Sequence, residues 1–86
     1  MNPNPAPLPL RVAIVDDHSM MREGIKLFFD NTSDMKCLWM AATAGEAVCM
    51  IKAEVPDVLV VDISLPDRSG LELIKDLRLS HPDLLM

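Results

Sequence analysis

Three carboxylates follow directly after short apolar runs that predict buried strands. Asp16 and Asp17 follow Arg11–Val15, and Asp62 follows Val58–Val61. Runs of this kind are typical of strands in a parallel sheet, and reactive groups in open α/β sheets lie just beyond the carboxyl ends of the strands. If the two strands lie side by side, the three acids meet at one edge of the sheet.

Clustered carboxylates favour a divalent cation. Like charges at close range raise one another's pKa, and a bound cation removes that repulsion. An oxygen-only site of two or three carboxylates with several waters suits Mg²⁺ better than zinc or calcium. A carboxylate beside such an ion can attack a phosphoryl group and form an acyl phosphate. For any one Asp alone, a helix cap or a turn is an equally good explanation, but it accounts less well for the combination.

The remaining segments must position these acids, and they alternate between helical and strand patterns. Helical segments show apolar residues at three- and four-residue spacing, and turn residues separate them from the strands. The further predicted segments are a helix over His18–Phe29, a strand over Met35–Ala42, a helix from Thr43 that ends before Pro56, and a helix from Leu71 that ends before Ser80.

The ends and faces of these helices can also be predicted. Asp17 or Ser19 is a suitable N-cap for the first helix, and Thr43 with Glu46 forms a capping box at the start of the second. We expect His18 to be a partly exposed residue at a helix start. The apolar stripe expected to face the core from the first helix consists of Met21, Ile25, Phe28 and Phe29.

An internal repeat predicts how the chain continues. Pro82–Met86 has the same layout as Pro56–Val60, so a fourth strand begins near the end of the sequence. Alternating strands and helices with right-handed crossovers give a parallel sheet covered by helices. We therefore expect a truncated α/β domain over residues 10–86. Alternate prolines in residues 1–9 favour extended conformations and predict a disordered tail.

Composition excludes several classes of protein. The chain of 86 residues has 8 Lys and Arg against 13 Asp and Glu, a net charge of −5, which argues against direct binding of nucleic acid. It has no apolar run near the ~20 residues of a membrane span and no leader pattern, so we expect a cytoplasmic protein. Cys37 and Cys49 are expected to be free thiols in the core.

Two motifs together give a specific family resemblance. Val15–His18 follows the first strand, and Asp62-x-x-x-Pro66-x-x-x-Gly70 follows the third. With them, Leu10–Met86 resembles the N-terminal two-thirds of a receiver domain from a two-component response regulator. The resemblance implies a flavodoxin-like, doubly wound parallel sheet with the second, first and third strands side by side in that order. The residues that make it similar to receivers linked to helix-turn-helix transcription output domains are His18, Arg22 and Gly24.

The resemblance implies a role for each matching residue. Asp62 would be the phosphoacceptor for a histidine kinase and would also be a ligand of Mg²⁺. The other ligands would be Asp17 directly, Asp16 largely through water and the backbone carbonyl of Ser64. Intact receivers also supply a Ser or Thr after a fourth strand and a Lys after a fifth, and neither position occurs in these 86 residues. We therefore expect a phosphoacceptor rather than an enzyme, with impaired phosphorylation in this chain alone.

A homo-oligomer is the expected assembly. Without a fourth and fifth strand, Val58–Ile63 would be an uncovered edge, and such an edge pairs readily with another chain. A two-fold dimer would cover this edge or the stub Leu84–Met86.

Two alternative functions come from other classes. A Mg²⁺-dependent phosphohydrolase with an Asp nucleophile commonly has a second acid two residues later, where this chain has Ser64. A nucleotide- or flavin-binding module of similar topology would need a glycine-rich cradle after the first strand, and this loop reads Asp16–Ser19.

Overall fold

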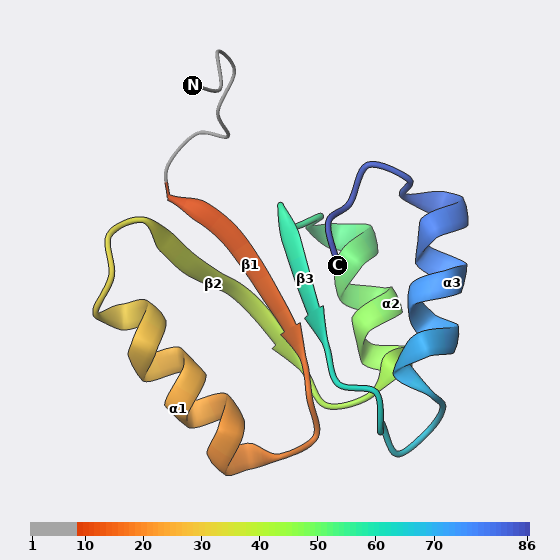
Figure 1. Ribbon diagram of the computed structural model, residues 1–86, viewed down its shortest axis with the longest axis horizontal. Coiled ribbons are helices and arrows are strands. Elements are labelled where there is room, and N and C mark those ends of the chain that lie inside the picture. Colours follow the sequence, from red (N-terminus) through yellow and green to blue (C-terminus); the bar gives the residue numbers. More distant parts are fainter. Residues whose placement is uncertain (1–8) are drawn as a thin grey trace.

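The structure is a computed structural model that describes residues 9–86. The predicted tail over residues 1–9 therefore lies outside the described residues, apart from Pro9. Within residues 9–86, strands and helices alternate as predicted (Figure 1). The elements are β1 (Leu10–Val15), α1 (Ser19–Asp30), β2 (Met35–Ala41), α2 (Ala44–Ala53), β3 (Val58–Val61) and α3 (Gly70–Ser80).

The three strands form one parallel sheet in the order β2-β1-β3, which confirms the predicted order. β1 lies in the middle, where Val15 pairs with Val61 of β3. The predicted start of a fourth strand is also confirmed. Leu85 forms a parallel bridge with Val58, and the N–H of Leu59 donates to the carbonyl of Leu85 at 2.8 Å.

The core lies between the sheet and the pair α2 and α3. Side chains alternate along a strand, so Ala13 and Val15 of β1 and Leu59 of β3 project to the same face. There they join Leu73 and Leu77 of α3, and all five are buried. This cluster fixes α3 beside β3, so the loop between them must cross the carboxyl edge of the sheet.

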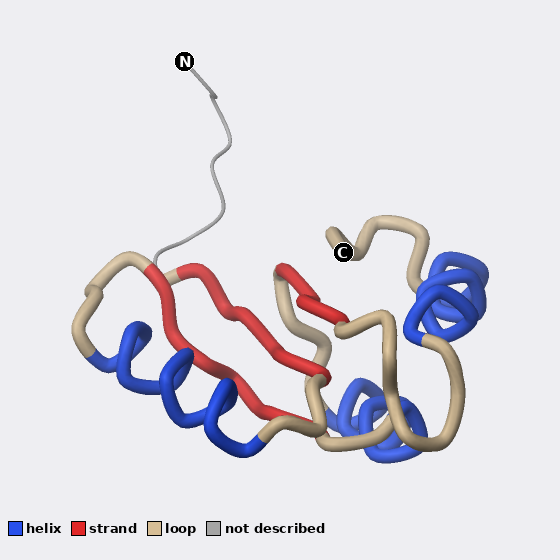
Figure 2. The backbone as a smooth tube through the Cα atoms, turned by 60° about the horizontal axis from the view of Figure 1, so that its bottom comes forward, coloured by secondary structure: helices blue, strands red, loops and turns tan. Residues whose placement is uncertain are grey.

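The opposite face is covered less completely than we predicted. None of the side chains of α1 is buried, and Met21 and Phe28 of its apolar stripe are 56% and 61% exposed. α1 packs against β2, on the other side of the molecule from α2 and α3 (Figure 2). Val60 on the α1 side of β3 is consequently 49% exposed. The prediction that Val58–Val61 is a buried strand is therefore correct for only one face of β3 and wrong for the face that carries Val60.

The helix starts show one correction and one confirmation. The N-cap of α1 is His18, with no side-chain capping bond, so neither Asp17 nor Ser19 caps this helix. The capping box of α2 is confirmed, because Thr43 Oγ1 accepts from the N–H of Glu46 at 3.0 Å. The Glu46 carboxylate in turn accepts from the N–H of Ala42 at 2.9 Å.

The two cysteines are free, but they do not both lie in the core. Cys37 is half-buried and Cys49 is exposed on α2, which corrects the predicted burial. Cys49 lies between the inward residues Ala47 and Ile51 on the helix, and its position faces away from the sheet. Among the described residues, no helix has the length and apolar character needed to cross a membrane.

Candidate functional site

The sheet brings the three acids together as the sequence predicts. Asp16 and Asp62 are the residues that follow the paired ends of β1 and β3, Val15 and Val61. The N–H of Asp62 donates to the carbonyl of Val15 at 2.9 Å, which holds the two chain ends side by side. Asp17 follows Asp16 on the same connection. The carboxyl edge of this parallel sheet therefore carries all three carboxylates.

The acids are close enough to bind one ion and open enough to be reached. Potential ligand atoms of Asp16, Asp17, Asp62 and His18 all lie within 4.8 Å of one another. The side chain of Asp16 is 13% exposed, that of Asp62 is 27% exposed and that of Asp17 is 35% exposed. The site is a shallow cluster at the surface that is accessible from solvent.

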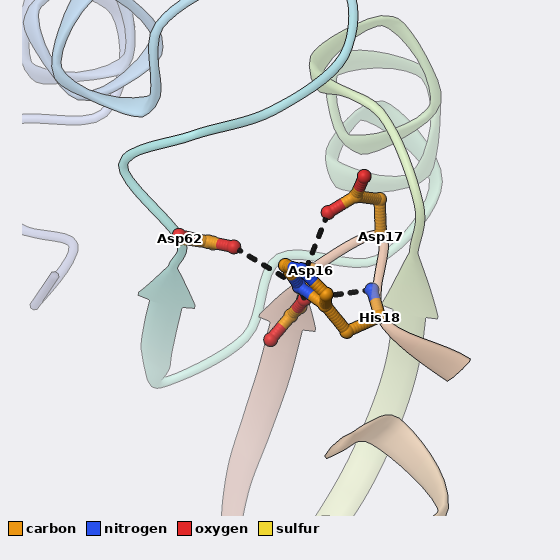
Figure 3. Close-up of side chains that lie close together, drawn as sticks. All are labelled: Asp16, Asp17, His18 and Asp62. Carbon is orange, nitrogen blue, oxygen red and sulfur yellow. Dashed lines mark hydrogen bonds and ion pairs between the residues drawn. The ribbon is translucent and has the colours of Figure 1, made fainter. Parts of the chain in front are cut away.

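His18 is an exposed residue at the start of α1, as predicted, but the sequence analysis did not predict its contacts with the acids. Its ring Nδ1 lies 2.8 Å from Asp16 Oδ1, 3.3 Å from Asp17 Oδ1 and 3.5 Å from Asp62 Oδ2 (Figure 3). The ring therefore contacts all three acids. The sequence signal that could have indicated these contacts was the position of His18 directly after two acids at a strand end.

Charge and hydrogen bonding shift the pKa values of two groups in the cluster. The hydrogen bond to Asp16 and the charges of the three acids raise the pKa of His18. Burial acts to raise the pKa of Asp16, but hydrogen bonds from the backbone and ring of His18 together outweigh it, so the pKa is lowered. The lowered pKa favours the carboxylate form of Asp16, and the raised pKa favours the protonated, positively charged form of His18 beside the acids.

The loop after β3 folds tightly against Asp62. The N–H of Ser64 donates to Asp62 Oδ1 at 3.1 Å, and Ser64 also bridges to Ser69. The N–H of Gly70 donates to the carbonyl of Ile63 at 2.7 Å. A Cβ on Gly70 would lie only 2.0 Å from the carbonyl oxygen of Asp62, so the start of α3 approaches Asp62 as only glycine permits.

The donor set fits a hard divalent cation. Three carboxylates at the surface provide oxygen ligands, and their exposure leaves room for bound waters, as Mg²⁺ requires. A cation that bound all three acids would displace the ring of His18. Its side chain is 65% exposed, so it is free to turn toward solvent.

The family model of the response regulator receiver domain matches residues 12–86. The parallel sheet in the order β2-β1-β3 is matched by the fold of a solved response regulator domain. The chain belongs to the response regulator receiver domain family.

Curated relatives are transcriptional regulators. The chain is 36% identical over 75 residues to the DNA-binding transcriptional activator DevR/DosR of Mycobacterium tuberculosis, covering 87% of this chain. It is 34% identical over 74 residues to the uncharacterized transcriptional regulatory protein YhcZ of Bacillus subtilis, covering 86% of this chain. The aligned part is 35% of the length of each relative, so the chain spans about a third of these proteins.

Solved receiver structures share the fold. A two-component response regulator of the LuxR family from Aurantimonas sp. SI85-9A1 is 31% identical, with a TM-score of 0.79 over 86% of this chain and 53% of that one. The response regulator domain of CheB from Thermotoga maritima is 36% identical, with a TM-score of 0.78 over 85% and 55%. These neighbours confirm the predicted flavodoxin-like receiver fold.

Proposed function

We propose that this chain is the phosphoacceptor domain of a two-component signalling protein and that Asp62 receives a phosphoryl group from the phosphohistidine of a histidine kinase. The observation that carries the proposal is the position of Asp62 at the carboxyl end of β3, within 4.8 Å of Asp16 and Asp17. The regulatory relatives favour control of transcription by the whole protein, in the cytoplasm. With its net charge of −5, the chain itself is not expected to bind nucleic acid.

In the proposed reaction, a carboxylate oxygen of Asp62 attacks phosphorus. The bond from phosphorus to the histidine nitrogen breaks, that nitrogen retains the electron pair and takes a proton if required, and an acyl phosphate forms. Asp17, Asp62, the backbone carbonyl of Ser64 and, largely through water, Asp16 would hold Mg²⁺. When bound, Mg²⁺ neutralises charge on the acids and on the phosphoryl oxygens.

The chain is proposed to accept phosphate rather than to turn over substrate. The alternative phosphohydrolase would need a general acid two residues after the nucleophile, and Ser64 is at that position. The 86-residue chain also has no Lys after a fifth strand to stabilise the transferring oxygens, a contribution that is often the largest in catalysis. We therefore expect slow phosphorylation of this chain on its own.

Labelling by a small phosphodonor tests the role of Asp62. On incubation with phosphoramidate and Mg²⁺, we expect the chain to form a base-labile, acid-stable adduct, which mass spectrometry detects. Asp62→Asn should form none, because an amide cannot form the acyl phosphate. The matched control is Asp83→Asn at an exposed acid beyond α3, which should be labelled like the wild type. An adduct retained in Asp62→Asn would contradict the proposal.

We further propose that a second copy of this chain covers the outer edge of β3. Leu85 pairs with only the first part of this edge, at Val58 and Leu59. Beyond it, Val60 and Ile63 are 49% and 60% exposed, and Leu85 itself is 65% exposed. We therefore propose that the contact lies in the second half of Val58–Ile63, next to the stub Leu84–Met86.

Light scattering after size-exclusion chromatography tests the homo-oligomer. At micromolar concentration we expect twice the mass of one chain, and Ile63→Lys should shift the equilibrium toward the monomer because it places charge in the contact. Leu79→Lys is the control, since Leu79 is 86% exposed on α3. A stable, compact monomer for the wild type would refute this assembly.

A further inference from the structure

One side chain ties the loop after β3 to the start of α2. Asp67 Oδ1 accepts from the N–H of Ala44 and Oδ2 from the N–H of Gly45, both at 2.9 Å. The first N–H groups of a helix have no partner within the helix, and the helix dipole favours a carboxylate at this end. These two hydrogen bonds lower the pKa of Asp67, which keeps the group charged.

The hydrogen bonds that Asp67 accepts do not duplicate the helix's own cap. Thr43 Oγ1 accepts from the N–H of Glu46, and the Glu46 carboxylate accepts from the N–H of Ala42. The capping box is thus complete within the segment that begins α2. The two bonds to Asp67 join a different part of the chain to the same helix end.

Asp67 completes a set of links around the acid cluster. The N–H of Asp62 bonds to the carbonyl of Val15, which ties β3 to β1. The N–H of Asp16 bonds to the carbonyl of Ala41 at 2.9 Å, which ties the end of β1 to the end of β2. α2 begins three residues after Ala41, and Asp67 connects its start to the loop that begins at Asp62. Hydrogen bonds therefore link the end of β1 to the end of β2, the end of β3 to the end of β1, and the loop after β3 to the start of α2.

The loop is too short for Asp67 to move independently of the site. Asp67 is three residues after Ser64, and each residue spans at most about 3.6 Å of chain. Leu65, between them, is buried in the core at 9% exposure. The loop is attached to the core through Leu65 and to α2 through Asp67. Loss of the hydrogen bonds to Asp67 would leave only the attachment at Leu65. Ser64 lies in the same loop, between Asp62 and Asp67, and would become less well fixed.

We infer that Asp67, by clamping the start of α2, is a positioning residue that holds Asp62 and the backbone of Ser64 in place beside Asp16 and Asp17. This inference rests on the proposed function, because its consequence is measured at the proposed metal site. Asp67 does not contact the acids in the structure, and it acts through the loop.

Magnesium affinity, measured by isothermal titration calorimetry, tests the inference on the full chain. Asp67→Ala should raise the Kd for Mg²⁺ about tenfold, the lower end of the loss seen when a group that orients a ligand is removed. Glu46→Ala is the matched control, because it removes a carboxylate and a hydrogen bond from the same helix end without touching the loop. Its Kd should equal that of the wild type within error.

Amide hydrogen exchange gives a second readout. Exchange at the N–H of Gly70, which donates to Ile63, should be faster in Asp67→Ala and unchanged in Glu46→Ala. If Asp67→Ala does not fold, Asp67→Asn replaces it in the test. Asp67→Asn keeps one acceptor oxygen, so its Kd for Mg²⁺ should rise above that of the wild type by less than tenfold. If folded Asp67→Ala has the Mg²⁺ Kd of the wild type, or if Glu46→Ala loses as much Mg²⁺ affinity as Asp67→Ala, the inference about Asp67 is wrong. Either result would leave the proposed function standing. A wild-type chain that binds no Mg²⁺ would overturn the proposed metal site and the inference with it.

Discussion

Gly70→Ala should destabilise the chain by about 3 kcal/mol or more, because the added methyl group would clash with backbone atoms that can move only at a high cost in free energy. Its Cβ would lie 2.0 Å from the carbonyl oxygen of Asp62, 2.9 Å from the carbonyl carbon of Asp62 and 3.0 Å from the Cα of Ile63. For a domain of this size the whole free energy of unfolding is about 4 to 13 kcal/mol. We expect the variant to unfold at a much lower urea concentration, or not to fold.

The fluorescence of Trp39 is a suitable probe for this measurement. Trp39 is 6% exposed, and its Nε1–H donates to the carbonyl of Glu54 at 3.0 Å, so unfolding changes its surroundings fully. Gly24→Ala is the control, since nothing lies within 4 Å of the added Cβ in the middle of α1. It should stabilise the chain by up to about 1 kcal/mol through helix propensity. Equal unfolding midpoints for Gly70→Ala and wild type would show that the loop adapts.

The order of the elements could be predicted because each follows from a local pattern. Apolar runs predicted β1 and β3, and a weaker alternating pattern predicted β2. The repeat of the Pro–Asp layout at Pro82 predicted the start of the fourth strand that Leu85 forms. The burial of individual side chains could not be predicted in the same way. Val60 and Phe28 have the right spacing for a core, but their exposure depends on where α1 packs across the sheet. That packing is a tertiary property.

The site was partly predictable for the same reason. Asp16, Asp17 and Asp62 meet because strand ends in a parallel sheet share an edge, and sheet order follows from the family resemblance. The contacts of His18 depend on side-chain geometry at the start of α1, where the ring is largely exposed but its Nδ1 lies 2.8 Å from Asp16 Oδ1. The clamp by Asp67 joins residues more than twenty positions apart in the chain, and no local pattern signals it.

Asp17→Asn should weaken Mg²⁺ binding by about 100-fold or more, since even groups that only orient a metal ligand contribute about 10- to 100-fold. Asp17 is the acid proposed to contact the ion directly, and its side chain is 35% exposed at the open side of the cluster. A 100-fold loss corresponds to about 2.7 kcal/mol of binding free energy. Calorimetric titration and the Mg²⁺-dependent rise in unfolding midpoint should both report the loss.

Stability without Mg²⁺ separates loss of a ligand from loss of the fold. Asp17→Asn removes one of three like charges within 4.8 Å, so the metal-free variant should be as stable as the wild type within about 0.5 kcal/mol. Asp83→Asn changes the net charge equally at an exposed position beyond α3 and should leave the Mg²⁺ affinity unchanged. If both variants weaken binding alike, the ion responds only to the overall charge of −5 and no specific site exists at the edge of the sheet. A selective loss in Asp17→Asn would instead assign the ion to the carboxylates beside Asp62.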